Sequence, residues 1–168
     1  MSKGNWSEED RRRFIGHLNE QLPTKRVIAQ GVLRNERDEV LLCELTYKRE
    51  WDLPGGVVDK GESPLSCLAR ECSEELGQAP PIRGLLTTTW LPPYRGWDDA
   101  VLFLFDLGRV SADWIADLTL QPREIVAVHW CAPEVVAERA AGYTTELLHA
   151  VSDPAIAPYL ERPNPAGG

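Results

Sequence analysis

Three glutamates, Glu71, Glu74 and Glu75, lie close together in a segment with the pattern of an α-helix. At about 100° per residue they fall within roughly a 100° arc of that helix. Like charges three or four residues apart destabilise a helix by roughly 0.2–0.5 kcal/mol per pair, and folding does not require the arrangement. Carboxylate oxygens that converge from one face are ligands for Mg²⁺ or Mn²⁺. The spacing therefore predicts a divalent metal site.

The surrounding segment, residues 56–78, matches the pattern G-x5-E-x7-R-E-U-x-E-E-x-G-U, in which U is a bulky aliphatic residue. It resembles the Nudix box of the Nudix hydrolase family. Two aliphatic positions depart from the pattern, because Cys72 and Gln78 occupy them. Cysteine behaves as a small hydrophobe, so Cys72 can still face a core. The matching residues are Gly56, Glu62, Arg70, Glu71, Glu74, Glu75 and Gly77.

The resemblance implies roles for these residues. Glu71, Glu74 and Glu75 would bind Mg²⁺ or Mn²⁺, and the carbonyl of Gly55 would add a backbone ligand. The alternative for the three glutamates is an exposed acidic helix face without a ligand.

Three further residues of the box would support the metal ligands. Glu62 and Arg70 would brace the helix and orient Glu71, and Gly56 would belong to the same supporting set. Two alternatives remain open. Glu62 could simply favour the N-terminus of the helix, and Arg70 could form an ordinary surface ion pair.

The resemblance also implies a general base, because in several Nudix hydrolases a further glutamate from a late loop reaches over the metals. Glu124, just before a predicted strand, fits that position. Asp98 and Asp99 are other candidates, and the box glutamates could themselves do this work. The alternative for Glu124 is a charged residue at a strand entry.

Aromatic side chains could stack on a nucleobase. The candidates are Trp51, Trp90, Tyr94 and Trp97, although Trp51 could equally belong to the core. Two family markers that follow the box in sequence indicate different substrates. Pro92 and Pro93 fit a proline that marks ADP-ribose hydrolases, and Tyr94 fits a tyrosine that marks hydrolases of dinucleoside polyphosphates.

The resemblance implies a metal-dependent pyrophosphohydrolase that splits a nucleoside diphosphate linked to another moiety into a nucleoside monophosphate and a phosphorylated product. ADP-ribose or a nucleotide sugar is slightly favoured over a (deoxy)nucleoside triphosphate or a dinucleoside polyphosphate. A different class of protein is a Nudix domain that senses nucleotides without catalysis. The three intact glutamates argue against that class. The family also mildly favours a homodimer.

Composition narrows the possible partners. The net charge of −8 argues against a nucleic-acid surface, and no apolar run approaches the ~20 residues needed to cross a bilayer. The start of the chain lacks the apolar core of a signal peptide. The four cysteines contain no C-x-x-C pair, so we expect reduced thiols in a cytoplasmic protein rather than a zinc site.

Hydrophobic periodicity and capping signals predict the elements. Helices are expected over residues 6–21, 64–76, 112–118, 133–140 and 144–151, and strands over residues 26–33, 39–45, 51–53, 57–58, 82–90, 100–107 and 124–130. This order predicts an α/β protein with a mixed sheet and helices on both faces, in agreement with the α/β/α sandwich of Nudix proteins. We expect a helical extension over residues 1–24, the Nudix domain over residues 25–152 and an irregular segment over residues 153–168.

Overall fold

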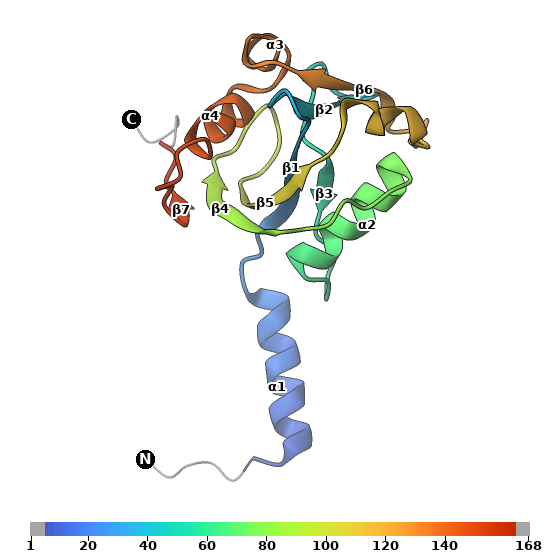
Figure 1. Cartoon of the computed structure of the whole chain (residues 1–168). Helices are drawn as coiled ribbons and strands as arrows, with labels where there is room; N and C mark the ends of the chain where they lie inside the picture. The colour runs from blue at the N-terminus through green and yellow to red at the C-terminus, as the bar shows by residue number, and fades with distance from the viewer. Residues whose placement is uncertain (1–5, 164–168) are drawn as a thin grey trace.

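The computed structural model describes residues 6–163, which build a mixed seven-stranded sheet (Figure 1). The strand order is β6-β2-β1-β5-β4-β7, with β3 paired to β1 off this path. β1 runs parallel to β5 and antiparallel to β2 and β3. The strands are β1 (Arg26–Arg34), β2 (Val40–Leu45), β3 (Gly55–Val57), β4 (Gly84–Leu91), β5 (Ala100–Arg109), β6 (Ile125–Cys131) and β7 (Tyr159–Leu160).

Helices cover both faces of this sheet, as predicted. Successive side chains of a strand point to opposite faces. Leu102 and Leu104 of β5 accordingly join a core with α3 (Pro133–Arg139) and α4 (Gly142–Ala150), whereas Phe105 and Leu107 join a second core with α2 (Pro64–Leu76). The three-layer α/β/α architecture is confirmed.

Helix α2 carries the box, and local signals set its two ends. The Ser63 side chain accepts a hydrogen bond from the backbone N–H of Ser66, and Pro64 occupies the first turn. Gly77 ends the helix in the left-handed conformation, at φ 72°. Cys72 is buried in the core, so it fills the aliphatic position of the box pattern.

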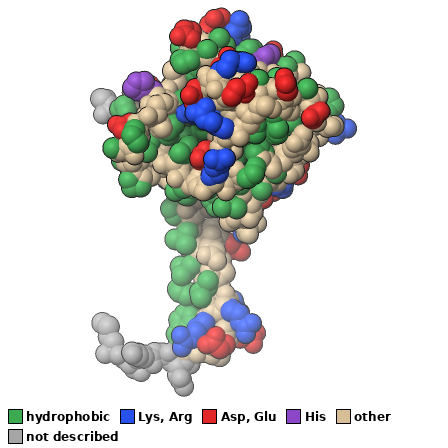
Figure 2. Space-filling view, in the orientation of Figure 1, with side chains coloured by type: hydrophobic (Ala, Val, Ile, Leu, Met, Phe, Trp, Pro, Cys, Tyr) green, Lys and Arg blue, Asp and Glu red, His purple; other side chains and the backbone are tan. Residues whose placement is uncertain are grey.

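Helix α1 (Glu8–Gln21) forms as predicted, with Ser7 as its N-cap. It extends away from the sheet as a stalk, and apolar side chains follow one edge of that stalk (Figures 1 and 2). No side chain of α1 is buried.

Removing residues 1–22 should therefore leave the rest of the protein folded, because little buried surface is lost. We expect the melting temperature of the truncated protein to lie within about 3 °C of the full chain. A drop of about 10 °C or more in a thermal melt would show that α1 is part of the cooperative unit.

Three elements differ from the prediction. Residues 51–53 form only isolated bridges, from Trp51 to Ala140 and from Asp52 to Cys43. Residues 112–117 form a 3₁₀ helix, η1 (Ala112–Asp117). The expectation of an irregular segment after residue 152 is wrong at β7, which pairs in parallel with β4. The buried hydroxyls of Thr87 and Thr89 donate to carbonyls of this C-terminal segment, and this anchoring depends on contacts distant in sequence.

Within residues 6–163, no helix has the length and apolar character needed to cross a bilayer.

Candidate active site

The turn into β3 brings the backbone against α2. Gly55 adopts φ 127°, and its N–H donates a 3.0 Å hydrogen bond to Oε2 of Glu75. A Cβ atom at Gly55 would overlap the carbonyl oxygen of Ala29 on β1. A Cβ atom at Gly56 would lie 2.5 Å from Oε1 of Glu71. Glycine at both positions allows the backbone to approach two of the predicted metal ligands.

Arg70 contacts the carboxylates of Glu62, Glu71 and Glu74. Its guanidinium donates two 2.9 Å hydrogen bonds to Glu62, a 2.9 Å bond to Glu71 and a 3.1 Å bond to Glu74. The hydrogen bonds from Arg70, with one from the backbone of Asp59, lower the pKa of Glu62 to about 2. Arg70 thus connects Glu62 to Glu71 and Glu74, and the bracing role of Glu62 and Arg70 stays a prediction.

Glu75 is the most enclosed of these carboxyl groups, at 5% exposure. Burial, together with the nearby charges of Glu71 and Glu124, raises its pKa to about 8 against the opposing effect of the Gly55 N–H. Burial also raises the pKa of Glu71, although Arg70 opposes the shift. The ionised forms of these groups therefore need further positive charge close by.

Four carboxylates, those of Glu71, Glu74, Glu75 and Glu124, line one cavity of about 910 Å³, and we call them the carboxylate group. Their oxygens suit a hard divalent cation, because Mg²⁺ takes one or two carboxylates and fills its other positions with water and substrate phosphate. In the described part of the chain, no three acidic, histidine or cysteine side chains already enclose a common metal position. Arg70 contacts Oε1 of Glu71 and Oε2 of Glu74, which leaves the other oxygen of each carboxylate for a cation.

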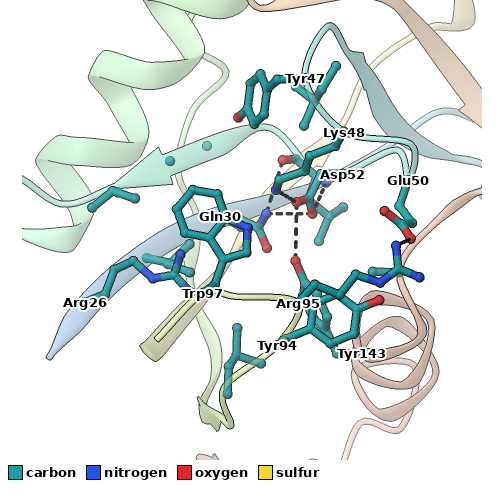
Figure 3. A pocket seen from close by; sticks show the side chains of 18 of the residues that line it. Arg26, Gln30, Tyr47, Lys48, Glu50, Asp52, Tyr94, Arg95, Trp97 and Tyr143 are labelled. Carbon is teal, nitrogen blue, oxygen red and sulfur yellow. Dashed lines mark hydrogen bonds and ion pairs between the residues drawn. The ribbon is translucent and has the colours of Figure 1, made fainter. Parts of the chain in front are cut away.

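The structure separates the four predicted aromatic residues. Tyr94 and Trp97 line the cavity, with the guanidinium groups of Arg95 and Arg26 over their rings (Figure 3). Trp51 and Trp90 are not among the residues that line this cavity, and their role in substrate binding stays a prediction.

These two tryptophans contact other side chains. Trp51 stacks on His129 with ring centroids 4.0 Å apart, and Trp90 donates a 2.8 Å hydrogen bond to Asp99. Asp99 also pairs with Lys25, and neither Asp98 nor Asp99 lines the cavity. Of Glu124, Asp98 and Asp99, Glu124 alone lines the cavity together with the glutamates of the box.

Sequence reasoning missed a second set of cavity residues, Gln30, Lys48, Asp52 and Tyr143, which we call the polar cluster (Figure 3). Asp52 lies at its centre, and the other three side chains all donate hydrogen bonds to its carboxylate. Although burial opposes it, the charge and hydrogen bond of Asp52 raise the pKa of Lys48. One signal was available, since Gln30 is the only polar side chain in the apolar run of residues 27–33.

Comparisons with known proteins agree with this architecture. The family model described as NUDIX domain matches residues 24–150. A MutT-like protein of Streptomyces ambofaciens is 31% identical over 130 residues, which cover 77% of this chain and 79% of that protein. The crystal structure of the MutT protein from Methanosarcina mazei Go1 aligns with a TM-score of 0.65 at 24% identity, covering 78% of this chain and 96% of that one. An RNA pyrophosphohydrolase of Ruthia magnifica subsp. Calyptogena magnifica is 44% identical over 46 residues, a match that spans only 26% of its length.

Proposed function

Because the chain belongs to the Nudix hydrolase family, whose members act on phosphoanhydride bonds, we propose that it is a metal-dependent pyrophosphohydrolase. Its substrate is a nucleoside diphosphate linked to another moiety, and its products are a nucleoside monophosphate and a phosphorylated compound. One observation carries the proposal. The carboxylates of Glu71, Glu74, Glu75 and Glu124 line a single cavity that also contains aromatic and basic side chains.

In this proposal Glu71, Glu74 and Glu75, with the carbonyl of Gly55, would hold Mg²⁺ or Mn²⁺. Such a cation would supply positive charge for the diphosphate and lower the pKa of a water molecule. Arg70 and Glu62 keep Glu71 oriented, and the hydrogen bond from Gly55 fixes Glu75. Tyr94 and Trp97 offer exposed ring surface to the nucleoside end of the substrate.

Glu124 is the proposed general base, since its carboxylate belongs to the same cavity and comes from the segment just before β6. We expect Glu124→Gln to lower kcat by about 100-fold or more, with a smaller change in KM, because the variant retains the shape of the side chain but accepts no proton. Steady-state kinetics on the substrate identified below would measure this. An unchanged kcat would return the role of base to Glu71, Glu74 or Glu75.

A substrate panel tests the proposed function directly. ADP-ribose, nucleotide sugars, dinucleoside polyphosphates, nucleoside triphosphates and prenyl diphosphates would each be incubated with the protein and Mg²⁺ or Mn²⁺. Added phosphatase would convert monoester products to measurable phosphate. Metal-dependent turnover of one nucleotide class would support the proposal and identify the substrate group. No turnover, combined with tight binding of one nucleotide, would overturn it in favour of a nucleotide sensor.

A further inference from the structure

The polar cluster contains a hydrogen-bond acceptor that has no partner among residues 6–163. The carbonyl oxygen of the Gln30 side chain is buried there without a hydrogen bond, and Gln30 is only 4% exposed. Gln30 nevertheless lines the cavity (Figure 3). Because an unsatisfied buried acceptor costs free energy, a native protein usually has a reason to retain one.

The orientation of the Gln30 amide is fixed by its neighbours. Its Nε2 donates a 2.8 Å hydrogen bond to Oδ1 of Asp52 and lies 3.5 Å from the carbonyl oxygen of Leu53. Both neighbours are acceptors, so only the NH₂ group satisfies them, and the oxygen must take the other position. The amide therefore presents an acceptor, and its donors are already used.

A donor binds the same carboxylate as the Gln30 amide. Lys48 donates a 2.8 Å hydrogen bond to Oδ2 of Asp52, the other oxygen of the same carboxylate. A lysine ammonium has three N–H donors, so Lys48 retains donors after binding Asp52. The charges of Lys48 and Asp52 balance, and Asp52 is only 6% exposed. The cluster thus offers one acceptor and one donor without net charge, which suits an uncharged ligand edge rather than a phosphate.

Two further features place this pair within reach of a nucleotide bound at the carboxylate group. Gln30 lies directly opposite Gly55 in the β1–β3 ladder, and Gly55 in turn donates to Glu75. Trp97 lines the same cavity, and its side chain is 51% exposed although Arg26 covers part of the ring. An exposed indole face is a stacking surface for a base.

We propose that Gln30 and Lys48 read the Watson–Crick edge of the substrate's nucleobase. The Gln30 carbonyl accepts an N–H of the base, and Lys48 donates to the adjacent nitrogen or oxygen acceptor. This inference rests on the proposed function and makes it more specific, because it assigns Gln30 and Lys48 to the base and the carboxylate group to the diphosphate. The proposed contact would also let the protein distinguish nucleotides from diphosphates that lack a base, such as prenyl diphosphates.

Methylated nucleotides test the proposal on the wild-type protein. Calorimetric titration would compare AMP with N6,N6-dimethyl-AMP, GMP with 1-methyl-GMP and UMP with 3-methyl-UMP, all with Mg²⁺. These monophosphates contain no phosphoanhydride bond, so binding is measured apart from hydrolysis. For the nucleotide that binds best, we expect methylation to weaken binding about tenfold or more, since it removes the N–H and leaves Gln30 unpaired. Equal affinity for both members of each pair, or no binding of any monophosphate, would overturn the proposal.

Variants identify the residue that makes the contact. Gln30→Met should remove the preference for the unmethylated nucleotide, and Lys48→Met should weaken binding of the unmethylated nucleotide. Tyr143→Phe is the matched control, because it also removes a hydrogen bond to Asp52 but leaves the Gln30 carbonyl in place. It should retain the preference. A preference that persists in Gln30→Met would overturn the proposal. If the protein hydrolyses a nucleotide but does not prefer the unmethylated base, this inference alone is refuted. If it prefers the unmethylated base but hydrolyses no substrate, only the proposed hydrolysis is refuted.

Discussion

Replacing Glu75 by glutamine is expected to reduce turnover by about a thousandfold, equivalent to about 4 kcal/mol of transition-state stabilisation. Glutamine has nearly the same volume, and its carbonyl oxygen can still accept the hydrogen bond from Gly55. The substitution therefore removes the negative charge of a proposed metal ligand and little else. Hydrolysis of the substrate identified by the panel, measured at saturating Mg²⁺, would check this result.

Glu146→Gln is the control for the Glu75 variant. Glu146 lines the same cavity but pairs with Arg162 at 2.6 Å and does not belong to the carboxylate group. We expect its substitution to change turnover less than about threefold, since exposed ion pairs contribute little. Turnover of Glu75→Gln within tenfold of the wild type would refute the assignment of Glu75 as a metal ligand.

The Glu75→Gln substitution should also change how the stability of the protein depends on pH, measured in EDTA. Because the pKa of Glu75 is raised from its ordinary value of 4.5 to about 8, the folded protein holds a proton there that the unfolded chain releases. The contribution of Glu75 to the stability of the wild type should therefore fall as the pH rises from about 4.5 to about 8. Glutamine does not ionise, so the stability of Glu75→Gln relative to the wild type should rise across this window. A difference in melting temperature between Glu75→Gln and the wild type that stays constant across this pH range would contradict the raised pKa of Glu75.

The second large effect is expected from Gly56→Ala. The added Cβ atom would lie 2.5 Å from Oε1 and 2.6 Å from Cδ of Glu71, so the Glu71 carboxylate must move. That carboxylate is also held by Arg70 at 2.9 Å. Displacing a reacting group by about 1 Å costs about 100-fold in rate, and we expect a loss of this size in kcat/KM. The protein should remain folded, because the displaced atoms are the end of a side chain.

Gly142→Ala provides the comparison for this substitution. Gly142 lines the same cavity, but no heavy atom of residues 6–163 outside its own surroundings in the chain lies within 4 Å of a Cβ atom placed there. Its activity should match that of the wild type. If Gly56→Ala also kept wild-type kcat/KM, the close approach of the turn to Glu71 would have no role in catalysis.

Much of the fold follows from signals close together in the sequence. Ser63, Pro64 and Gly77 set the ends of α2 because capping involves only neighbouring backbone groups. Alternating apolar residues predicted most strands, since the pleat of a strand has a fixed period. β7 was missed because two residues contain no periodicity, and its pairing with β4 connects segments about 70 residues apart.

The sequence by itself determined the carboxylate face of α2, because helical spacing places Glu71, Glu74 and Glu75 together before any tertiary contact forms. Only the tertiary structure decided which other side chains share their cavity. Trp51 packs on His129 and Trp90 donates a hydrogen bond to Asp99, although an aromatic side chain equally suits a base pocket. The polar cluster joins residues from β1, the segment before β3 and α4, and no local pattern predicts which distant side chains will surround one buried carboxylate. Side-chain spacing within one element is set by backbone geometry, whereas contacts between elements depend on the packing of the whole sheet.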